Sequence, residues 1–149
     1  MPQFLHNAPA DRIAAALRAL SRDMDDPYAL DDATLALALQ GDTRAVLALE
    51  ADTPVGVALW SPFVSTTRGR IGAFVTDLWV HRDQRGSGLG RSLLRAVREA
   101  AQARWGATFL RLNHAVDNPA AAAFYARLGF QPNPKDLWLT LESEALERL

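Results

Sequence analysis

Apolar side chains recur at helical spacing near the start of the chain. Over residues 11–21 they share one face, which predicts an amphipathic helix with Ile13, Leu17 and Leu20 buried. A second helix is predicted after Asp31-Asp32, because aspartate is a good N-cap and two leucines follow at helical spacing, Leu35 and Leu39. An acidic segment interrupted by Pro27 separates the two predicted helices.

The middle third of the chain changes to β-rich runs. Residues 44–50 and 55–63 are predicted strands, joined by a hairpin turn over residues 51–54. A loop is expected over residues 61–70, followed by a third strand over 71–81. Simple alternation assigns its side chains to two faces, one with Phe74, Thr76, Leu78 and Val80 and the other with Val75, Asp77, Trp79 and His81.

Helical spacing returns near Gly88. Leu89, Leu93 and Val97 begin an apolar stripe that continues toward Trp105, opposite a polar face with Arg91, Arg95, Arg98 and Gln102. A short strand is predicted over residues 108–113, and a helix of about three turns begins after Asn118-Pro119 and stops at Gly129. Phe130 and residues 137–141 are predicted to supply the last strand. This order predicts one domain over residues 1–149, with a mixed α/β or α+β sheet.

Composition narrows the possible functions. The chain has 149 residues, 16 basic and 17 acidic side chains, a net charge of -1 and no cysteine. Thiol nucleophiles, disulfide scaffolds and cysteine-held metal centres are therefore excluded, and the near-neutral charge argues against a nucleic-acid partner. His6, His81 and His114 lack metal-ligand spacing, so no metal is expected. With neither a membrane-length apolar run nor an export signal, we expect a cytoplasmic protein without a membrane partner.

The segment Gln84-Arg85-Gly86-Ser87-Gly88-Leu89-Gly90-Arg91 joins a predicted strand to a predicted helix. Its glycines allow backbone N–H groups to turn inward, and the helix N-terminus adds partial positive charge, so the segment is suited to a phosphate or pyrophosphate. It is not a P-loop, because no lysine follows the glycines. It is not a Rossmann fingerprint either, because Arg91 or Leu93 stands where the last glycine belongs.

The spacing Arg-x-x-Gly-x-Gly at Arg85, Gly88 and Gly90 resembles the GNAT superfamily of acyl-CoA-dependent N-acetyltransferases. Residues 77–81 resemble that family's fourth strand, and residues 118–130 resemble its Asn…Phe-Tyr…Leu-Gly-Phe segment. The resemblance covers about residues 73–131, whereas the first 70 residues match only in the order of elements. It implies a mixed, mostly antiparallel central sheet, helices on both faces and splayed central parallel strands, with acetyl-CoA as acyl donor.

The same resemblance implies a set of residues that bind CoA. The pyrophosphate would lie on the main chain of the glycine loop, which comprises Arg85, Gly86, Ser87, Gly88, Leu89, Gly90 and Arg91. The pantetheine arm would pair with the main chain of Leu78, Trp79 and Val80, and one N–H there would stabilise the oxyanion. Asn118 would contact the arm in addition to capping its helix. The alternative is that the glycines only form a tight turn and that Trp79 only packs.

Two side chains are candidate catalysts by resemblance. Tyr125 matches the tyrosine that protonates the departing thiolate in many relatives, although it also fits an apolar stripe with Phe124 and Leu128. Asp77 stands on the strand where many relatives carry a glutamate base; because aspartate is shorter, water is the alternative route for the proton. The acidic positions Asp23, Asp25, Asp26, Asp31 and Asp32 either attract a cationic amine or form a solvated loop with N-caps.

The function expected from these residues is acetyl transfer from acetyl-CoA to a primary amine by direct attack, since no cysteine is present to form a covalent intermediate. A small-molecule amine, such as a polyamine or an amino-acid-like compound, is the expected acceptor. A protein N-terminus or lysine is the alternative within this class, and a non-catalytic acyl-CoA-binding sensor is the alternative outside it. A nucleotide-binding fold of another kind is disfavoured by both failed motif tests. The resemblance also implies a homodimer.

Overall fold

Five strands form one sheet in the order β1-β2-β3-β4-β5. The computed structural model describes residues 1–149, and the strands are β1 (Gln3–Leu5), β2 (Arg44–Glu50), β3 (Thr53–Ser65), β4 (Arg70–Val80) and β5 (Phe109–Leu112). All neighbouring pairs are antiparallel except β4 and β5, which are parallel. The predicted mixed, mostly antiparallel sheet is confirmed. β1 was not predicted, because three residues are too few to establish a period.

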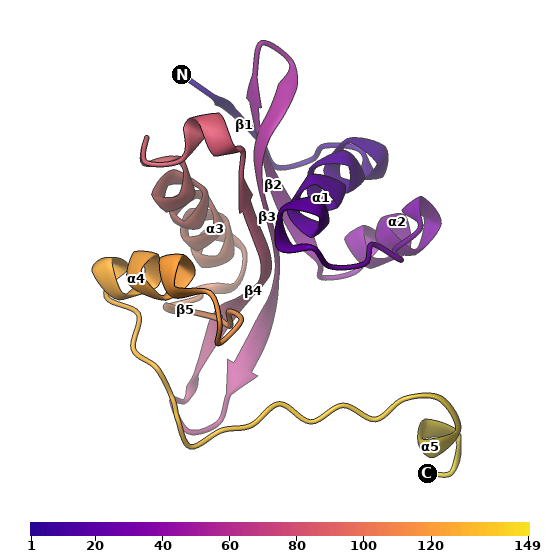
Figure 1. Ribbon diagram of the computed structural model, residues 1–149. Helices are drawn as coiled ribbons and strands as arrows, with labels where there is room; N and C mark the ends of the chain where they lie inside the picture. The colour runs from indigo at the N-terminus through magenta and orange to yellow at the C-terminus, as the bar shows by residue number, and fades with distance from the viewer. The chain divides into compact units, whose positions relative to one another are not determined.

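The chain divides into two compact units, residues Met1–Asn113 and His114–Leu149. In the first unit, α1 (Ala10–Met24) and α2 (Asp32–Gln40) lie on one face of the sheet and α3 (Leu89–Trp105) on the other (Figure 1). These three helices follow the predicted apolar stripes. The predicted cap of α2 is present, since the Thr34 N–H donates to the Asp31 carboxylate at 2.7 Å.

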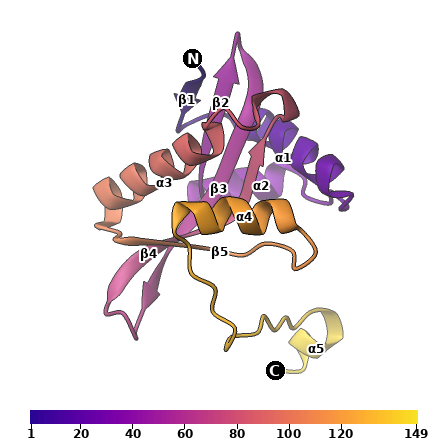
Figure 2. The ribbon, with the colours of Figure 1, turned by 60° about the vertical axis from the view of Figure 1, so that its left-hand side comes forward.

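Two predicted loops are shorter than expected. The β2–β3 turn consists of Ala51 and Asp52, both with positive φ, whereas the expected turn residues Thr53 and Pro54 already belong to β3. The loop expected over 61–70 is wrong, because β3 continues to Ser65 and β4 begins at Arg70. Aromatic contacts hold this longer hairpin, with the Phe63 ring 6.4 Å from Phe74 and 5.3 Å from Phe109. The hairpin projects beyond β2 (Figure 2).

The predicted alternation of side chains along β4 is wrong at one point. Leu59 of β3 pairs with Asp77 and Trp60 pairs with Val75, so Thr76 is an extra residue that forms a β-bulge. Paired residues share a face, so Phe74, Asp77 and Trp79 lie on the α1 side, whereas Val75, Leu78 and Val80 lie on the α3 side. The bulge therefore directs Asp77 away from the face of Val75.

β3 and α3 approach each other closely at Gly56. A Cβ atom at this position would lie 2.9 Å from the Leu93 side chain and 3.1 Å from the Trp79 carbonyl oxygen. The buried stripe of α3 packs on this face and comprises Leu89, Leu93, Leu94, Ala96, Val97 and Ala101. Glycine at 56 thus lets the first two turns of α3 lie directly against β3, beside the end of β4.

The second unit contains α4 (Pro119–Leu128) and the short α5 (Ser143–Glu147). As predicted, the Asn118 side chain caps α4 by accepting from the Ala121 N–H at 3.1 Å, and Gly129 ends the helix with φ 94°. The strand predicted from Phe130 and residues 137–141 is wrong: no strand forms there, and Leu137, Trp138 and Leu139 are exposed. Residues 137–141 are apolar apart from Thr140, but a strand also needs a partner strand, and residues 114–149 contain none. None of the helices is both long and apolar enough to span a membrane.

Candidate functional site

The glycine loop directly follows the end of β4. The chain leaves the strand through η1 (Arg82–Gln84), whose turn is closed by bonds from Gln84 N–H to the His81 carbonyl at 2.8 Å and from Arg85 N–H to the Arg82 carbonyl at 3.2 Å. Gly86 and Gly88 then adopt φ values of 78° and 90°. These left-handed conformations strain any residue with a Cβ, so the backbone path explains why glycine stands at both positions.

The first turn of α3 presents unpaired backbone donors. The first helical bond runs from Ser92 N–H to the Gly88 carbonyl at 3.0 Å, so the N–H groups of Leu89, Gly90 and Arg91 have no partner within the helix. No acidic residue lies in this turn. Ser87 adds no unpaired donor, because both its N–H and its hydroxyl donate to the Gln84 carbonyl. Three N–H groups at a helix N-terminus are chemically suited to an anionic oxygen.

The far half of β4 has one open edge. β5 pairs only with Gly72–Val75, so residues 76–80 of β4 have no strand on the side opposite β3. His81 N–H donates to the Val55 carbonyl at 2.8 Å, which fixes the alternation of the antiparallel ladder. By that alternation the N–H and C=O groups of Leu78 and Val80 point away from β3, whereas those of Trp79 point toward it. An extended ligand can therefore pair with Leu78 and Val80.

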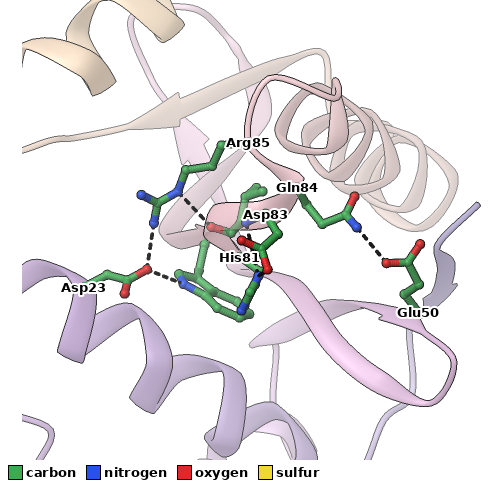
Figure 3. Close-up of polar contacts among 8 residues, drawn as sticks. Asp23, Glu50, His81, Asp83, Gln84 and Arg85 are labelled. Atoms are coloured by element: carbon green, nitrogen blue, oxygen red, sulfur yellow. Dashed lines mark hydrogen bonds and ion pairs between the residues drawn. The ribbon is translucent and has the colours of Figure 1, made fainter.

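A polar network joins this edge, the loop and the last turn of α1 (Figure 3). One oxygen of Asp23 accepts from Trp79 Nε1 at 2.9 Å and from Arg85 Nη2 at 2.7 Å. Arg85 Nε also donates to the Val80 carbonyl at 3.1 Å. Asp23 was expected only as one member of an acidic stretch. Its contacts lie 56 and 62 residues away in sequence, so no local pattern signals them.

A second contact holds the loop from the other side. Gln84 Nε2 donates to the Glu50 carboxylate at 2.6 Å, and Glu50 is the last residue of β2 (Figure 3). His81 Nδ1 accepts from the Asp83 N–H at 3.3 Å, so this histidine helps to form the turn that leads into the loop. The entry to the glycine loop is thus fixed by side chains from both α1 and β2.

Asp77 is a half-buried carboxylate on the α1 side of β4. Burial raises its pKa above the usual range, and a hydrogen bond with Thr76 opposes the rise. Tyr28 lies on the same side; its hydroxyl is buried without a hydrogen-bond partner, and its pKa is raised mainly by burial, with Asp77 among the smaller causes. The Arg18 guanidinium lies 5.1 Å from the Tyr28 ring centre and 3.3 Å from Asp32. This side of β4 therefore combines a destabilised carboxylate with an unpaired hydroxyl.

Tyr125 and Asn118, the remaining predicted site residues, belong to the second unit. The Tyr125 ring stacks on His114 at 5.9 Å and contacts Phe124 and Phe130 at 5.2 and 5.5 Å. Burial raises the pKa of its phenol above the usual value. The first unit brings together the other predicted site residues, namely Asp77, Leu78, Trp79, Val80 and the loop from Arg85 to Arg91. No group of three or more His, Cys, Asp or Glu side chains is arranged to hold a metal ion.

Comparison with known proteins places these features in a family. Residues 12–130 match the Acetyltransferase (GNAT) family. No curated protein gives a significant match. Similar solved structures include an aminoglycoside acetyltransferase from an uncultured soil metagenomic sample, with a TM-score of 0.78 and 15% identity over 95% of this chain and 97% of that one.

Two further structures share the fold. A ribosomal-protein-alanine N-acetyltransferase from Brucella melitensis biovar Abortus 2308 has a TM-score of 0.74 and 20% identity, over 95% of this chain and 99% of that one. An integron cassette protein from V. cholerae has a TM-score of 0.76 and 18% identity, over 99% and 96%. At these identities the likeness concerns the fold, whose sheet and flanking helices agree with those described above.

Proposed function

Since the chain belongs to the Acetyltransferase (GNAT) family, we propose that it transfers the acetyl group of acetyl-CoA to the primary amine of a small molecule. The observation that carries the proposal is the adjacency of two features. The open edge of β4 at residues 76–80 is followed, through η1 and the glycine loop, by the free N–H donors of Leu89, Gly90 and Arg91. An extended arm that ends in a pyrophosphate would match this order of groups.

The residues of the first unit fit the acyl donor. A Cβ at Gly86 or Gly88 would meet no atom within 4 Å, so the loop borders open space in which a pyrophosphate can approach the backbone. The pantetheine arm pairs with Leu78 and Val80. When bound, acetyl-CoA supplies a thioester carbon that is open to attack by an amine.

The oxyanion formed during attack needs a fixed donor. The alternation of β4 supports Leu78 N–H or Val80 N–H in this role, whereas Trp79 N–H points toward β3. Trp79 contributes to the donor site through its side chain instead, which is 5% exposed and packed in the core on the α1 side.

Asp77 acts as the general base in this proposal. The ammonium form of the amine loses a proton to the Asp77 carboxylate, directly or through water, and the nitrogen then forms a bond to the acetyl carbon. The raised pKa of Asp77 supports this role, because it makes the carboxylate a stronger proton acceptor than an ordinary surface aspartate.

Tyr125 acts as the general acid. As the carbon–sulfur bond breaks, its hydroxyl donates a proton to the thiolate, so no charged leaving group accumulates. A phenol of ordinary pKa 10.0 is protonated at neutral pH, as a proton donor requires, and burial raises the pKa of Tyr125 further in that direction. Asn118 adds a side-chain contact to the CoA arm beside its cap of α4.

A small-molecule acceptor is supported by two similar structures that are aminoglycoside acetyltransferases, and by Asp77 on the side of β4 that faces Tyr28. The second candidate is N-terminal acetylation of a protein, which is favoured by the similar ribosomal-protein-alanine N-acetyltransferase. Thiol release with a panel of polyamines, aminoglycosides, amino acids and N-terminal peptides separates the two. CoA binding without turnover on any amine would instead favour a non-catalytic sensor.

Three further properties complete the proposal. Residues 1–149 form one acetyltransferase domain, because the family match at 12–130 extends across both units. The protein is a cytoplasmic homodimer, and the exposed Leu137, Trp138 and Leu139 support self-association because they form an apolar stretch that a second copy would cover. Light scattering coupled to size-exclusion chromatography tests the dimer, with a Leu139→Asp variant predicted to be monomeric.

A further inference from the structure

We infer that Asp23 is a positioning residue of the CoA site: it holds the start of the glycine loop and the end of β4 against the last turn of α1. The inference rests on the proposed function, since it concerns the site at which CoA is proposed to bind. Asp23 itself acts through Arg85 and Trp79 and is not proposed to touch the ligand.

The contacts of Asp23 converge on one atom. Its Oδ2 accepts from both Trp79 Nε1 and Arg85 Nη2, at 2.9 and 2.7 Å (Figure 3). Trp79 is buried, so its indole N–H requires an acceptor within the protein, and Asp23 is that acceptor. The carboxylate therefore links the last turn of α1 to two points, one on β4 and one at the start of the loop.

Arg85 transmits this restraint to the backbone. Its Nε donates to the Val80 carbonyl while its Nη2 bonds Asp23, so the guanidinium bridges α1 and the open edge of β4. This bridge uses the Val80 carbonyl and leaves the Val80 N–H and the Leu78 groups for a ligand. Arg85 also stands directly before Gly86, whose left-handed conformation begins the loop.

The loop needs such a restraint because its own backbone is permissive. Glycine at positions 86 and 88 allows many conformations, and only some of them aim the N–H groups of the α3 turn at one point. Holding Arg85 reduces this freedom before a ligand binds, which lowers the entropic cost of binding. The Asp23–Arg85 pair is too exposed to matter much for stability, with side chains 42% and 57% exposed.

Charge and position make opposite predictions for removal of the Asp23 carboxylate. CoA is a polyanion, so deleting a negative charge beside the loop favours CoA binding on electrostatic grounds alone. Deleting it also frees Arg85 to turn toward a phosphate. If Asp23 positions the loop, by contrast, its removal weakens binding. The sign of the change therefore distinguishes the two roles.

The test is calorimetric titration of CoA and acetyl-CoA into the full chain and its variants, alongside steady-state kinetics. Asp23→Asn is expected to raise the Kd for CoA and the KM for acetyl-CoA about five- to tenfold and to leave kcat within about twofold, because an ion-paired hydrogen bond is lost at the donor site only. Asp23→Glu is expected to restore part of the affinity. Asp52→Asn is the matched control. It likewise removes an ion pair that involves α1, the 2.9 Å contact between Asp52 and Arg12, but it does so away from the glycine loop.

A double-mutant cycle tests the route through Arg85. Arg85→Gln keeps the bond between Asp23 and Trp79, so it remains informative if Asp23→Asn folds poorly. Because both substitutions break the bond between Asp23 and Arg85, the loss of affinity in the double variant is expected to be smaller than the product of the two single losses. The inference would be overturned if the fold-loss of CoA affinity in the double variant equalled the product of the two single losses. It would also be overturned if Asp23→Asn bound CoA more tightly than the unmodified chain. Absence of CoA binding by the unmodified chain would instead refute the proposed function.

Discussion

Asp77 lies directly opposite Leu59 across the β3–β4 pair, one residue beyond the bulge at Thr76. The bulge places this carboxylate on the α1 side of the sheet, together with Trp79, while the main chain of Leu78 remains at the open edge of β4. A proton acceptor and a backbone donor thus come from adjacent residues. In the proposed reaction the carboxylate would accept the proton of the amine and the backbone N–H would stabilise the oxyanion.

Replacing Asp77 by asparagine tests its role as base. The Asp77→Asn variant is expected to lose about 10²- to 10⁴-fold in kcat, the usual contribution of a positioned base, with little change in KM for acetyl-CoA. In the unmodified enzyme, kcat/KM is expected to fall as pH falls through the raised pKa of Asp77. Rates measured from pH 5 to 9 check this; a variant with an unchanged rate and pH profile would assign the proton transfer to water or another group.

The same substitution has a stability consequence. The pKa of Asp77 in the folded protein is raised above the ordinary aspartate value of 3.8, so the folded state favours the protonated carboxyl. Its stabilising contribution is full below the unfolded pKa and is lost as pH rises through the folded pKa. Asp77→Asn is therefore expected to unfold at a higher temperature than the unmodified chain at pH 7, with a smaller difference near pH 4. If Asp77→Asn were no more stable than the unmodified chain at pH 7, burial of the charged Asp77 carboxylate would not be destabilising.

Tyr125→Phe tests the general acid. The variant keeps the ring contacts with His114 and Phe124 but removes the proton donor, so kcat is expected to fall about 10²- to 10⁴-fold. Because burial raises the pKa of Tyr125 above 10.0, the alkaline limb that it contributes lies above pH 10. Assays at pH 9 with amines that are already deprotonated bypass the general base. They therefore measure the effect of losing the general acid alone. Full turnover by Tyr125→Phe would show that the thiolate leaves unassisted.

Gly88→Ala tests the loop, with Gly69→Ala as its control. Both glycines have positive φ, 90° and 64°, and a Cβ added at either would meet no atom within 4 Å, so each substitution costs about 1–2 kcal/mol of backbone strain. Only Gly88 caps α3, so only Gly88→Ala is expected to weaken CoA binding. Melting temperatures and CoA titrations check both variants. Equal affinity for CoA in the two variants would mean that the loop is only a turn and does not bind CoA.

Gly56→Ala tests how closely α3 must approach the sheet. The added Cβ would lie 2.9 Å from Leu93 and 3.1 Å from the Trp79 carbonyl, so overpacking is expected to cost about 1–3 kcal/mol. Gly41→Ala is the comparison, because its nearest atom is 3.4 Å away and its φ is negative. Chemical denaturation measures both. A Gly56→Ala protein as stable as the Gly41→Ala protein would mean that α3 shifts freely on the sheet.

Local signals predicted local structure well. The caps at Asp31 and Asn118 and the stop at Gly129 were identified because each depends on residues within one helical turn. The bulge at Thr76 was missed, because an extra residue in a strand leaves the alternating pattern intact and only shifts its pairing. Residues 137–141 were predicted to supply strand material, but a short apolar run alone supplies no partner strand.

The candidate site divides in the same way. The glycine loop and the residues of β4 were found from sequence, since they are continuous in the chain. The link from Asp23 to Trp79 and Arg85 joins residues more than fifty positions apart, and only the folded chain brings them together. The orientation of the Leu78, Trp79 and Val80 main chain likewise depends on pairing with β3 rather than on side-chain type.

The most direct test of the central claim is thermal unfolding of the chain with acetyl-CoA, CoA, ATP or NAD present in turn. A ligand at about 100 times its Kd adds about 2.7 kcal/mol to the free energy of unfolding, which raises the melting temperature of a domain of this size by several degrees. We predict a rise with acetyl-CoA and CoA and none with ATP or NAD. No rise with either CoA compound, from a folded sample, would contradict the assignment of the glycine loop and the β4 edge to an acyl-CoA site.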